Sequence, residues 1–454
     1  MTREDDTSEP GFDRNAVLLR LRNFGLLSAE DICRIVIGFL VTLALAKYLG
    51  PSQFGALGYL TSIVALLMPF TVFGLDVIVL RQFVAHPASM GSVLASSMAI
   101  RLFGSVVAVA LALAFFDIAG GPAGTSLYLM AIASISLIAM PWQSLNLYFK
   151  AEERPVIFAL PRIVIVIAAA VAILILIDRG YGLESIIWLR VFETAAMALA
   201  AIIAFVLFAR HRISITVDTV QLHTLLRQGF PLFISAIAVI IYMRVDQIML
   251  GTTAPVAELG NYSLAVRFSE AAFFIPMALQ TAFYPALVRA RKVGNEHFRS
   301  ELRRYFDAVS GVMMALVLAV GVASHAIILL ALGDEYRGAI PAVWILSAAL
   351  PFVGIGVARS SYLTIEGKFW AAPIATLIGA AMNVALNFLL IPQYGGTGAA
   401  IASLISYWLA AHGTCYLLPQ LRSIAPDIAR SLNPIGVMMR VVPPMVALVT
   451  DKRP

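Results

Sequence analysis

Charged side chains recur inside long apolar stretches of this 454-residue chain. Between Phe230 and Glu270, one such stretch carries Arg244 and Asp246, and the next carries Arg267 and Glu270. Each stretch is about 20 residues long, which is the length of a helix that crosses a bilayer. An ionisable side chain at the bilayer centre costs roughly 2.5 kcal/mol or more, so it normally faces a protein interior or a water-filled cavity. The pattern predicts a polar path through a membrane.

Three arginines have a carboxylate three positions away within an apolar stretch, in the pairs Asp31/Arg34, Arg190/Glu193 and Arg267/Glu270. Residues at that spacing share one helix face, so we expect three ion pairs, which lower the cost of burying each charge. Arg244 and Asp246 are two apart and point to different faces, so we expect them to find partners on other helices. Arg101 and Arg162 have no such neighbour and are expected to be unpaired.

A rise of 1.5 Å per residue gives the depth of these charges. Arg244 lies about 20 Å from the cytoplasmic start of its stretch, and Arg267 with Glu270 lies roughly 8–12 Å below the outer surface, at the same level. Arg34 lies within roughly 10 Å of the inner surface. Since the fixed charge and forked donors of arginine suit phosphate, these three arginines are the candidate anion-binding residues.

The alternative for the arginines near helix ends is that they extend to the membrane interface and have no other role. It applies to Arg101, Arg162, Arg190 and Arg359.

The composition independently indicates a membrane protein. Hydrophobic residues make up 60% of the chain and charged residues 13%, whereas soluble domains contain about 25% charged residues. The net charge of +6 is spread over short loops, so it does not indicate nucleic-acid binding. Cys33 and Cys415 lie far apart, and no CxxC or Cys/His metal spacing occurs, so we expect neither a structural disulfide nor a metal site.

Twelve apolar runs have the length of a membrane span and predict an all-α polytopic fold. Their boundaries are 27–47, 56–77, 95–117, 125–147, 156–177, 184–208, 230–250, 262–286, 307–332, 340–362, 370–391 and 397–419. A thirteenth run, 434–449, is shorter and is interrupted by Arg440 and Pro443. It is an interfacial segment or the remnant of another span, and we do not count it.

Lysine and arginine are enriched in cytoplasmic loops and so predict the orientation. They gather in the N-terminal tail and in the connections after the sixth and eighth spans, while the loops 118–124, 251–261 and 392–396 contain none. Both termini are therefore expected in the cytoplasm. The predicted units are a cytoplasmic tail (1–25), a six-helix lobe (26–208), a cytoplasmic linker (209–229), a second six-helix lobe (230–419) and a C-terminal tail (420–454).

The two halves contain a weak internal repeat. Leu49 to Leu60 reads LGPSQFGALGYL, and Leu250 to Leu264 reads LGTTAPVAELGNYSL. Both have Leu-Gly, a short loop with proline, a glycine, and then an aromatic residue that opens the next span. Transporters are often built from such duplications. The alternative is that glycine and proline simply interrupt any membrane hairpin.

Two longer runs carry a family resemblance. Val245 to Glu270 reads VDQIMLGTTAPVAELGNYSLAVRFSE, and Leu45 to Leu67 reads LAKYLGPSQFGALGYLTSIVALL. Both resemble hairpins of the bacterial polysaccharide, or lipid-linked oligosaccharide, flippases of the multidrug/oligosaccharidyl-lipid/polysaccharide exporter superfamily. The resemblance covers about 25 to 420, although the longer members of that family have fourteen spans.

The resemblance implies two six-helix lobes that form a V around a central cavity, which opens alternately to each side of the bacterial inner membrane. The implied cargo is an undecaprenyl-pyrophosphate-linked oligosaccharide, moved from the cytoplasmic to the periplasmic leaflet for lipopolysaccharide O-antigen, capsule or exopolysaccharide assembly. Membrane lipids and other polysaccharide-assembly proteins are the further expected partners. No cofactor is implied, but coupling to H⁺ or Na⁺ is.

The resemblance also implies that cavity arginines bind the pyrophosphate. Arg34 matches best by position, followed by Arg244 and Arg267. The nearby carboxylates are expected to neutralise these arginines in the empty site and to exchange a coupling ion; they are Asp31, Asp246 and Glu270.

Two other functions are compatible with a membrane bundle. A multidrug cation antiporter of the same superfamily needs a net acidic cavity, whereas intramembrane arginines here at least match the carboxylates. A membrane-embedded glycan ligase or polymerase needs a large outer loop with catalytic residues, whereas the predicted outer loops are about a dozen residues or fewer. The chain also lacks a P-loop, an HExxH motif and a GxSxG motif, which disfavours an enzyme.

Overall fold

The computed structural model describes residues 14–209 and 216–440, and these residues form helices and no strands. The first half contains α1 (Arg14–Val72), α2 (Leu75–Ala85), α3 (Met90–Ala119), α4 (Leu127–Ala139), α5 (Asn146–Ala151), α6 (Val156–Asp178) and α7 (Leu183–Phe208), with 3₁₀ turns at Pro87–Ser89 and Met140–Leu145.

The second half begins with α8 (Thr219–Thr253), α9 (Val256–Glu270), α10 (Phe274–Val293) and α11 (Asn295–Ile327). It continues with α12 (Ala339–Ser347), α13 (Leu350–Ile365), α14 (Ala371–Trp408), α15 (Thr414–Leu417) and α16 (Ala425–Ser431). Two π-helical turns, Ile328–Leu332 and η5 (Leu409–Gly413), extend α11 and α14, and Asp334–Tyr336 forms a 3₁₀ turn.

Two of the long helices are broken by glycine. Gly50 in α1 has φ 66° and Gly395 in α14 has φ 52°, a left-handed conformation that glycine adopts without a Cβ clash. Ten helical stretches among the described residues are long and apolar enough to cross a membrane. Two of the ten are divided by these glycines. The predicted all-α fold with about twelve spans is confirmed.

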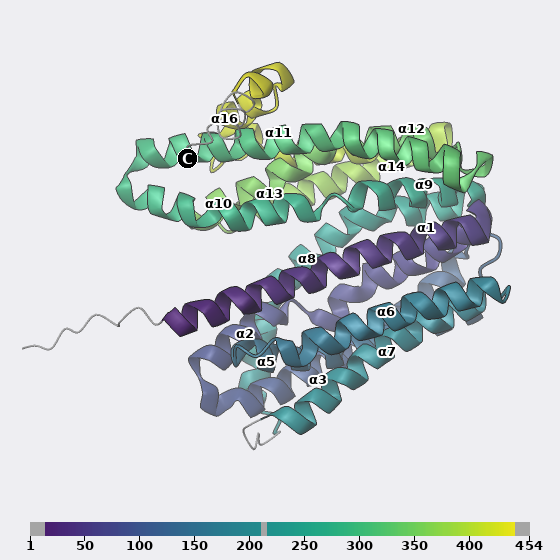
Figure 1. Ribbon diagram of the computed structural model, residues 1–454, viewed down its shortest axis with the longest axis horizontal. Helices are drawn as coiled ribbons and strands as arrows, with labels where there is room; N and C mark the ends of the chain where they lie inside the picture. The colour runs from purple at the N-terminus through teal and green to yellow at the C-terminus, as the bar shows by residue number, and fades with distance from the viewer. Residues whose placement is uncertain (1–13, 210–215, 441–454) are drawn as a thin grey trace, which may run out of the picture.

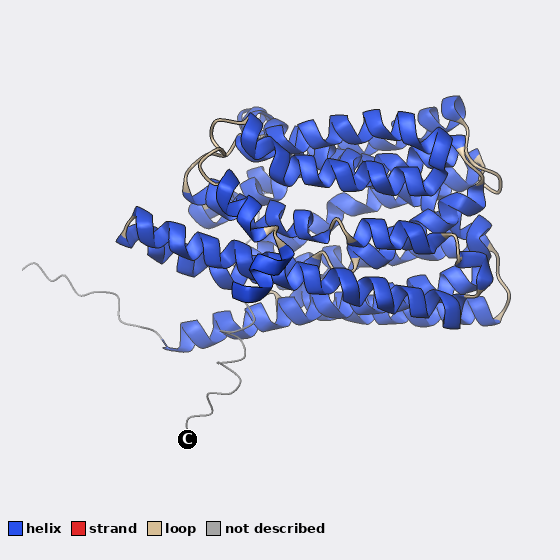
Figure 2. Cartoon of the chain, turned by 90° about the horizontal axis from the view of Figure 1, so that it is seen from above, coloured by secondary structure: helices blue, strands red, loops and turns tan. Residues whose placement is uncertain are grey.

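The helices form two lobes, with α1–α7 below and α9–α14 above in Figure 1, and most run side by side along the long axis (Figure 2). Helix α8 connects the lobes: Leu225, near its start, lies in the core of α2 and α3, whereas Tyr242 packs with Ala380 and Ala410. The linker predicted at 209–229 is thus helical from Thr219, and residues 210–215 within it lie outside the described residues.

The buried core is shared by the two lobes at one end of the molecule only. Near the glycine break of α1, one continuous cluster joins both lobes and includes Leu45, Tyr59, Leu259, Tyr262 and Ala399. At the other end of the molecule each lobe has its own cluster, one around α2, α3 and α5, the other around α11, α13 and α16. The lobes are therefore held together at the end near Gly50 and packed separately at the other.

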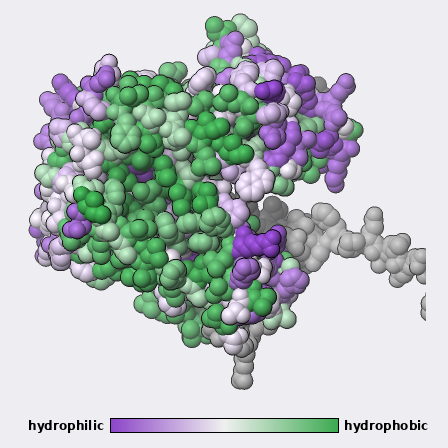
Figure 3. Space-filling model, turned by 180° about the vertical axis from the view of Figure 1, so that it is seen from behind, coloured by the Kyte–Doolittle hydropathy of each residue, from purple (hydrophilic) through white to green (hydrophobic). Residues whose placement is uncertain are grey.

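Apolar side chains cover a broad middle part of the face in Figure 3, and hydrophilic side chains gather toward its ends. The exposed apolar side chains of the molecule include Phe103, Val164 and Phe388. An exposed apolar surface of this extent is stable in lipid and not in water. The chain is a multi-pass membrane protein.

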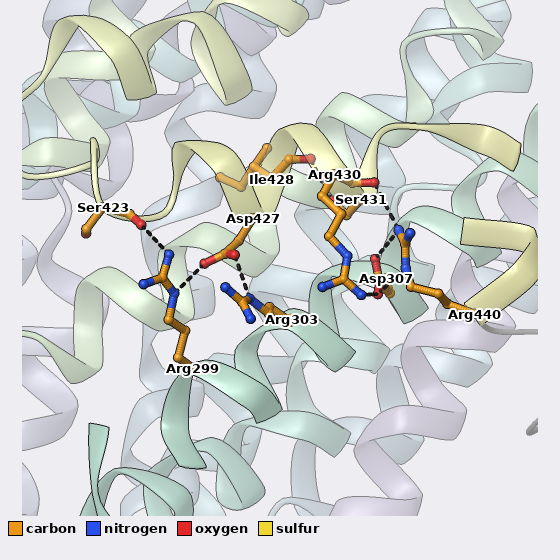
Figure 4. A network of polar contacts seen from close by, with 9 residues as sticks. All are labelled: Arg299, Arg303, Asp307, Ser423, Asp427, Ile428, Arg430, Ser431 and Arg440. Carbon is orange, nitrogen blue, oxygen red and sulfur yellow. Dashed lines mark hydrogen bonds and ion pairs between the residues drawn. The ribbon is translucent and has the colours of Figure 1, made fainter. Parts of the chain in front are cut away.

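The C-terminal segment is tied to α11 by two carboxylates (Figure 4). Buried Asp427 on α16 accepts hydrogen bonds from Arg299 at 2.9 Å and Arg303 at 2.6 Å. Asp307 on α11 accepts from Arg440 at 2.8 Å and 2.9 Å. The run 434–449 lies only in part within the described residues, since 441–454 are outside them.

Candidate functional site: a central cavity lined by arginine

A cavity of about 450 Å³ lies between the two lobes. Its walls come from both halves of α1, from α7 in the first lobe, and from α8 and α9 in the second. Its charged lining residues are Arg34, Arg190, Arg267 and Glu270. Pockets of some hundreds of Å³ with a few convergent polar groups are typical ligand sites.

The three ion pairs expected from the spacing are confirmed. Arg34 contacts Asp31 at 2.6 Å, and Arg190 contacts Glu193 at 2.9 Å. Arg267 contacts Glu270 at 3.6 Å, a looser pair. The three cavity arginines keep 48%, 37% and 41% of their side-chain surface exposed, so each has donors left for a ligand.

Glu270 also holds a second arginine from a neighbouring helix. Arg244 on α8 contacts its carboxylate at 3.0 Å, so one carboxylate on α9 bridges Arg244 and Arg267. This contact agrees with the common depth expected for the two arginines. Arg244 is only 13% exposed and does not line the cavity, but one of its terminal nitrogens, Nη1, has no hydrogen-bond partner. Arg244 therefore acts on the cavity through Glu270.

Asp246 lies outside the cavity, 4% exposed. Its carboxylate accepts hydrogen bonds from the Tyr262 hydroxyl, from Ser403 at 3.2 Å and from the Gln247 backbone N–H at 2.7 Å. Among the described residues no lysine or arginine forms an ion pair with it. Asp246 is thus a buried carboxylate held by neutral donors, on a different helix face from Arg244 as the spacing predicted.

The hydrogen bonds of Asp246 continue into the broken helix α14. Asn383 donates to Ser403 at 3.4 Å, and Asn387 donates to Asn383 at 3.0 Å. The side-chain oxygen of Asn387 is buried without a partner. Asn383 thus joins the two halves of α14 through Ser403, the residue that donates to Asp246.

Arg101 and Arg162 were expected to be unpaired, and that prediction is wrong. Arg101, 2% exposed, contacts Asp76 at 2.7 Å, and Arg162 contacts Glu30 at 3.3 Å. Both partners come from another helix, so helical spacing gives no signal for them. The interfacial alternative is also wrong for Arg101 and for Arg359, which is 4% exposed.

Arg359 on α13 donates hydrogen bonds to the backbone of the π-helical turn that follows α14 in the second lobe. Its Nη1 donates to the backbone carbonyls of Ala410 at 2.7 Å and Ala411 at 3.1 Å, and to the Thr414 hydroxyl at 3.1 Å. The two carbonyls belong to the π-helical turn η5. A π-helical turn inside an α-helix changes the spacing of the backbone hydrogen bonds, so backbone carbonyls there are open to a side-chain donor. Arg359 is therefore structural in this arrangement.

Arg190 is the cavity residue that sequence reasoning did not assign to the site. It is on α7, in the lobe opposite Arg267, and it lines the same cavity. The signal for it was present, because Arg190 and Glu193 form a charged pair within a span.

One end of the cavity is closed by a contact that we call the lobe seam, formed by Pro51, Gly55 and Gly58 of α1 with Val256, Gly260 and Ser263 of α9. A Cβ atom on Gly260 would lie 1.9 Å from the Pro51 carbonyl oxygen, and one on Gly55 would lie 2.2 Å from the Val256 carbonyl oxygen. The two backbones thus touch directly.

The lobe seam joins the two repeated runs of the sequence. Gly58 and Ser263 also line the cavity, so the seam forms its closed end. Nearby, the Tyr336 hydroxyl donates to the Ala46 carbonyl at 2.8 Å, and Ser62 donates to Gln247 at 3.0 Å. Each of these bonds also joins the first lobe to the second half of the chain.

Comparison with known proteins shows which family and which solved structures this chain resembles. The family model described as polysaccharide biosynthesis protein matches residues 20–291. A search of curated proteins gives no significant match.

Solved structures share the fold over nearly the whole chain. The structure titled lipid II flippase MurJ, inward closed conformation, is 18% identical with a TM-score of 0.71, covering 94% of this chain and 93% of that chain. An inward-facing multidrug resistance MATE family transporter of the MOP superfamily is 16% identical with a TM-score of 0.66, covering 93% and 96%. A point mutant of the Vibrio cholerae MATE transporter VcmN is 13% identical with a TM-score of 0.54, covering 90% and 98%.

These identities are low, so the structural matches establish the two-lobed fold alone. The family model covers more than half of the chain and matches both the α1 and the α8–α9 hairpins that carry the resemblance. The chain belongs to the polysaccharide biosynthesis protein family.

Proposed function

We propose that this protein is a flippase for a lipid-linked oligosaccharide, with undecaprenyl pyrophosphate as the lipid carrier, in the bacterial inner membrane. The observation that supports it best is the charge in and beside the central cavity. Three arginines line the cavity (Arg34, Arg190 and Arg267), against one carboxylate (Glu270). The excess of two positive charges favours an anionic head group.

The placement of the arginines suits alternating access. Arg34 and Arg190 belong to the first lobe, and Arg267 with Arg244 to the second. A pyrophosphate between them forms charge-assisted hydrogen bonds to both lobes at once and offsets the repulsion between their like charges. Asp31, Glu193 and Glu270 hold the arginines in the empty cavity, and the cargo then replaces those carboxylates as acceptor.

We place the lobe seam at the periplasmic end, because the arginine-rich connections lie at the opposite end. In this orientation both termini are cytoplasmic and the cavity accepts cargo from the inner leaflet. Binding between the lobes then shifts the population toward a state open to the periplasm. Asp246, which is buried and forms no ion pair with a lysine or arginine of the described residues, is the carboxylate best placed to take up H⁺ or Na⁺ during the return. Asp31 and Glu270 neutralise the cavity arginines when the site is empty and also exchange the coupling ion.

The rival functions are less consistent with these residues. A multidrug cation antiporter requires a cavity that attracts cations, and this cavity carries excess positive charge. A glycan ligase or polymerase requires catalytic groups outside the membrane. At the seam end, the described connections between helices are short, such as 120–126, 179–182 and 254–255.

The proposal is tested by replacing Arg34, Arg267 and Arg190 singly with alanine and measuring surface glycan in cells. Arg337→Ala is the matched control, because Arg337 also pairs with an acid three residues away (Asp334, 2.9 Å) but lies in the loop after α11. We expect the cavity variants to reduce export and to accumulate polyprenyl-linked repeat units on the cytoplasmic side. Normal export by all three variants at normal protein levels would refute the site.

A further inference from the structure

A second pocket opens off the central cavity inside the first lobe. It has a volume of about 220 Å³ and lies between the second half of α1, α4 and α7. The pocket adjoins the central cavity, because both spaces are lined by Leu57, Thr61 and Arg190. We call it the side pocket. It exceeds the roughly 30 Å³ that one liquid water occupies, so it has room for a chemical group of a ligand.

The polar atoms of the side pocket are biased toward accepting hydrogen bonds. Three hydroxyl groups line it, and each donates its proton to a carbonyl of its own helix: Thr61 to Leu57 at 2.8 Å, Ser136 to Ala133 at 2.6 Å and Thr194 to Arg190 at 3.0 Å. A hydroxyl that has donated its proton retains only lone pairs. The carboxylate of Glu193 adds further acceptor oxygens.

Apolar side chains make up the rest of the wall, including Leu60, Val64 and Ile187. A phosphate group has acceptors and negative charge, so the part of the side pocket beyond Arg190, which is lined by acceptors and a carboxylate, disfavours it. A sugar fits this lining better, because its hydroxyl groups and any acetamido N–H can donate hydrogen bonds, while its C–H faces are apolar. The central cavity thus suits the phosphate and the side pocket suits the sugar.

We propose that the side pocket binds the first sugar of the cargo, the residue attached to the pyrophosphate, and thereby selects cargo by that sugar. The proposal rests on the proposed function. Arg190 stands at the boundary, where it binds the phosphate oxygen next to the glycosidic bond. The Glu193 carboxylate, which orients Arg190 at 2.9 Å, accepts hydrogen bonds from the sugar.

The test compares two probes on the purified full-length protein in nanodiscs: undecaprenyl pyrophosphate without sugar, and the same lipid carrying one N-acetylhexosamine. Ser136→Ala and Thr194→Val each remove one acceptor with little change in volume. We expect each to weaken binding of the sugar-bearing probe roughly two- to tenfold, as for one lost hydrogen bond. Binding of the sugar-free probe should stay within about twofold, since that probe makes no hydrogen bond to either hydroxyl.

Ser134→Ala is the matched control. Ser134 is on α4, the helix of Ser136. It is buried and also donates to a carbonyl of its own helix, at 2.6 Å, but it does not line the side pocket. It should leave both probes unaffected, and thermal melting of all variants excludes misfolding as the cause.

Equal effects on both probes, or no effect on either, would overturn the side-pocket proposal while leaving the flippase intact. If lipid or water occupies the side pocket in place of the sugar, the variants affect the binding of neither probe. Failure of the unmodified protein to bind either probe would instead contradict the proposed function itself. The two proposals therefore fail in distinguishable ways.

Discussion

Gly260→Ala tests whether the lobe seam is specific to one conformation. The added Cβ would lie 1.9 Å from the Pro51 carbonyl oxygen, and ordinary contact begins at 3.4 Å, so the backbones must separate by the difference, 1.5 Å. The opposing atom belongs to the backbone, so no side-chain rotation relieves the clash. Overpacking of this kind costs about 1–3 kcal/mol.

That cost applies only while the seam is closed, because the helices touch only there. The equilibrium between seam-closed and seam-open states should therefore shift by a factor of roughly 5 to 150 toward the open state. The shift is measurable by double electron–electron resonance between spin labels at Gln53 and Asp334, both exposed near the seam on opposite lobes. The labels are placed in a background without Cys33 and Cys415.

We expect Gly260→Ala to show a longer-distance population that the unmodified protein lacks or has at a lower level. Gly356→Ala is the matched control, since Gly356 is a helical glycine with no atom within 4 Å of an added Cβ. An unchanged distance distribution in a correctly folded Gly260→Ala protein would refute the reasoning, because it would mean that the seam tolerates a methyl group without opening.

Two further predictions concern carboxylates that each hold two arginines. Glu270→Gln removes the charged partner of Arg244, which is 13% exposed, so we expect stability to fall by about 1–3 kcal/mol, below the cost at a fully buried pair; unchanged thermal melting and transport would contradict this. Asp427→Asn weakens the attachment of α16 to Arg303, so amide hydrogen exchange in 425–431 should rise at least severalfold. Glu301→Gln is the control: it alters an ion pair within α11 alone and should leave that exchange unchanged. Equal exchange in both variants would argue against the tether.

Local patterns predicted much of this structure because the physics behind them is local. Apolar runs of span length marked the helices, since the bilayer requires that length. The pairs Asp31/Arg34 and Arg190/Glu193 followed from helical geometry. The repeated pattern of Leu-Gly, a loop with proline and a further glycine also marked the hairpin at Gly50 that the lobe seam uses.

Contacts between helices were not predictable in this way. Arg101 pairs with Asp76 and Arg162 with Glu30, because the packing brings together segments far apart in the chain. The bridging role of Glu270 likewise depends on which helices are neighbours, and so does the lack of an ion pair between Asp246 and any described arginine. The same limit applies to the side pocket, since its acceptors come from three helices.

Reconstitution into liposomes tests most directly whether the protein transports an anionic lipid-linked glycan. The purified protein should move a fluorescent undecaprenyl-pyrophosphate oligosaccharide between leaflets, and Arg267→Ala should slow that movement roughly tenfold or more, as for the loss of a charge-assisted hydrogen bond of about 1.5–3 kcal/mol. Movement of a cationic drug with no movement of the glycolipid would contradict the account and would identify a cation antiporter instead.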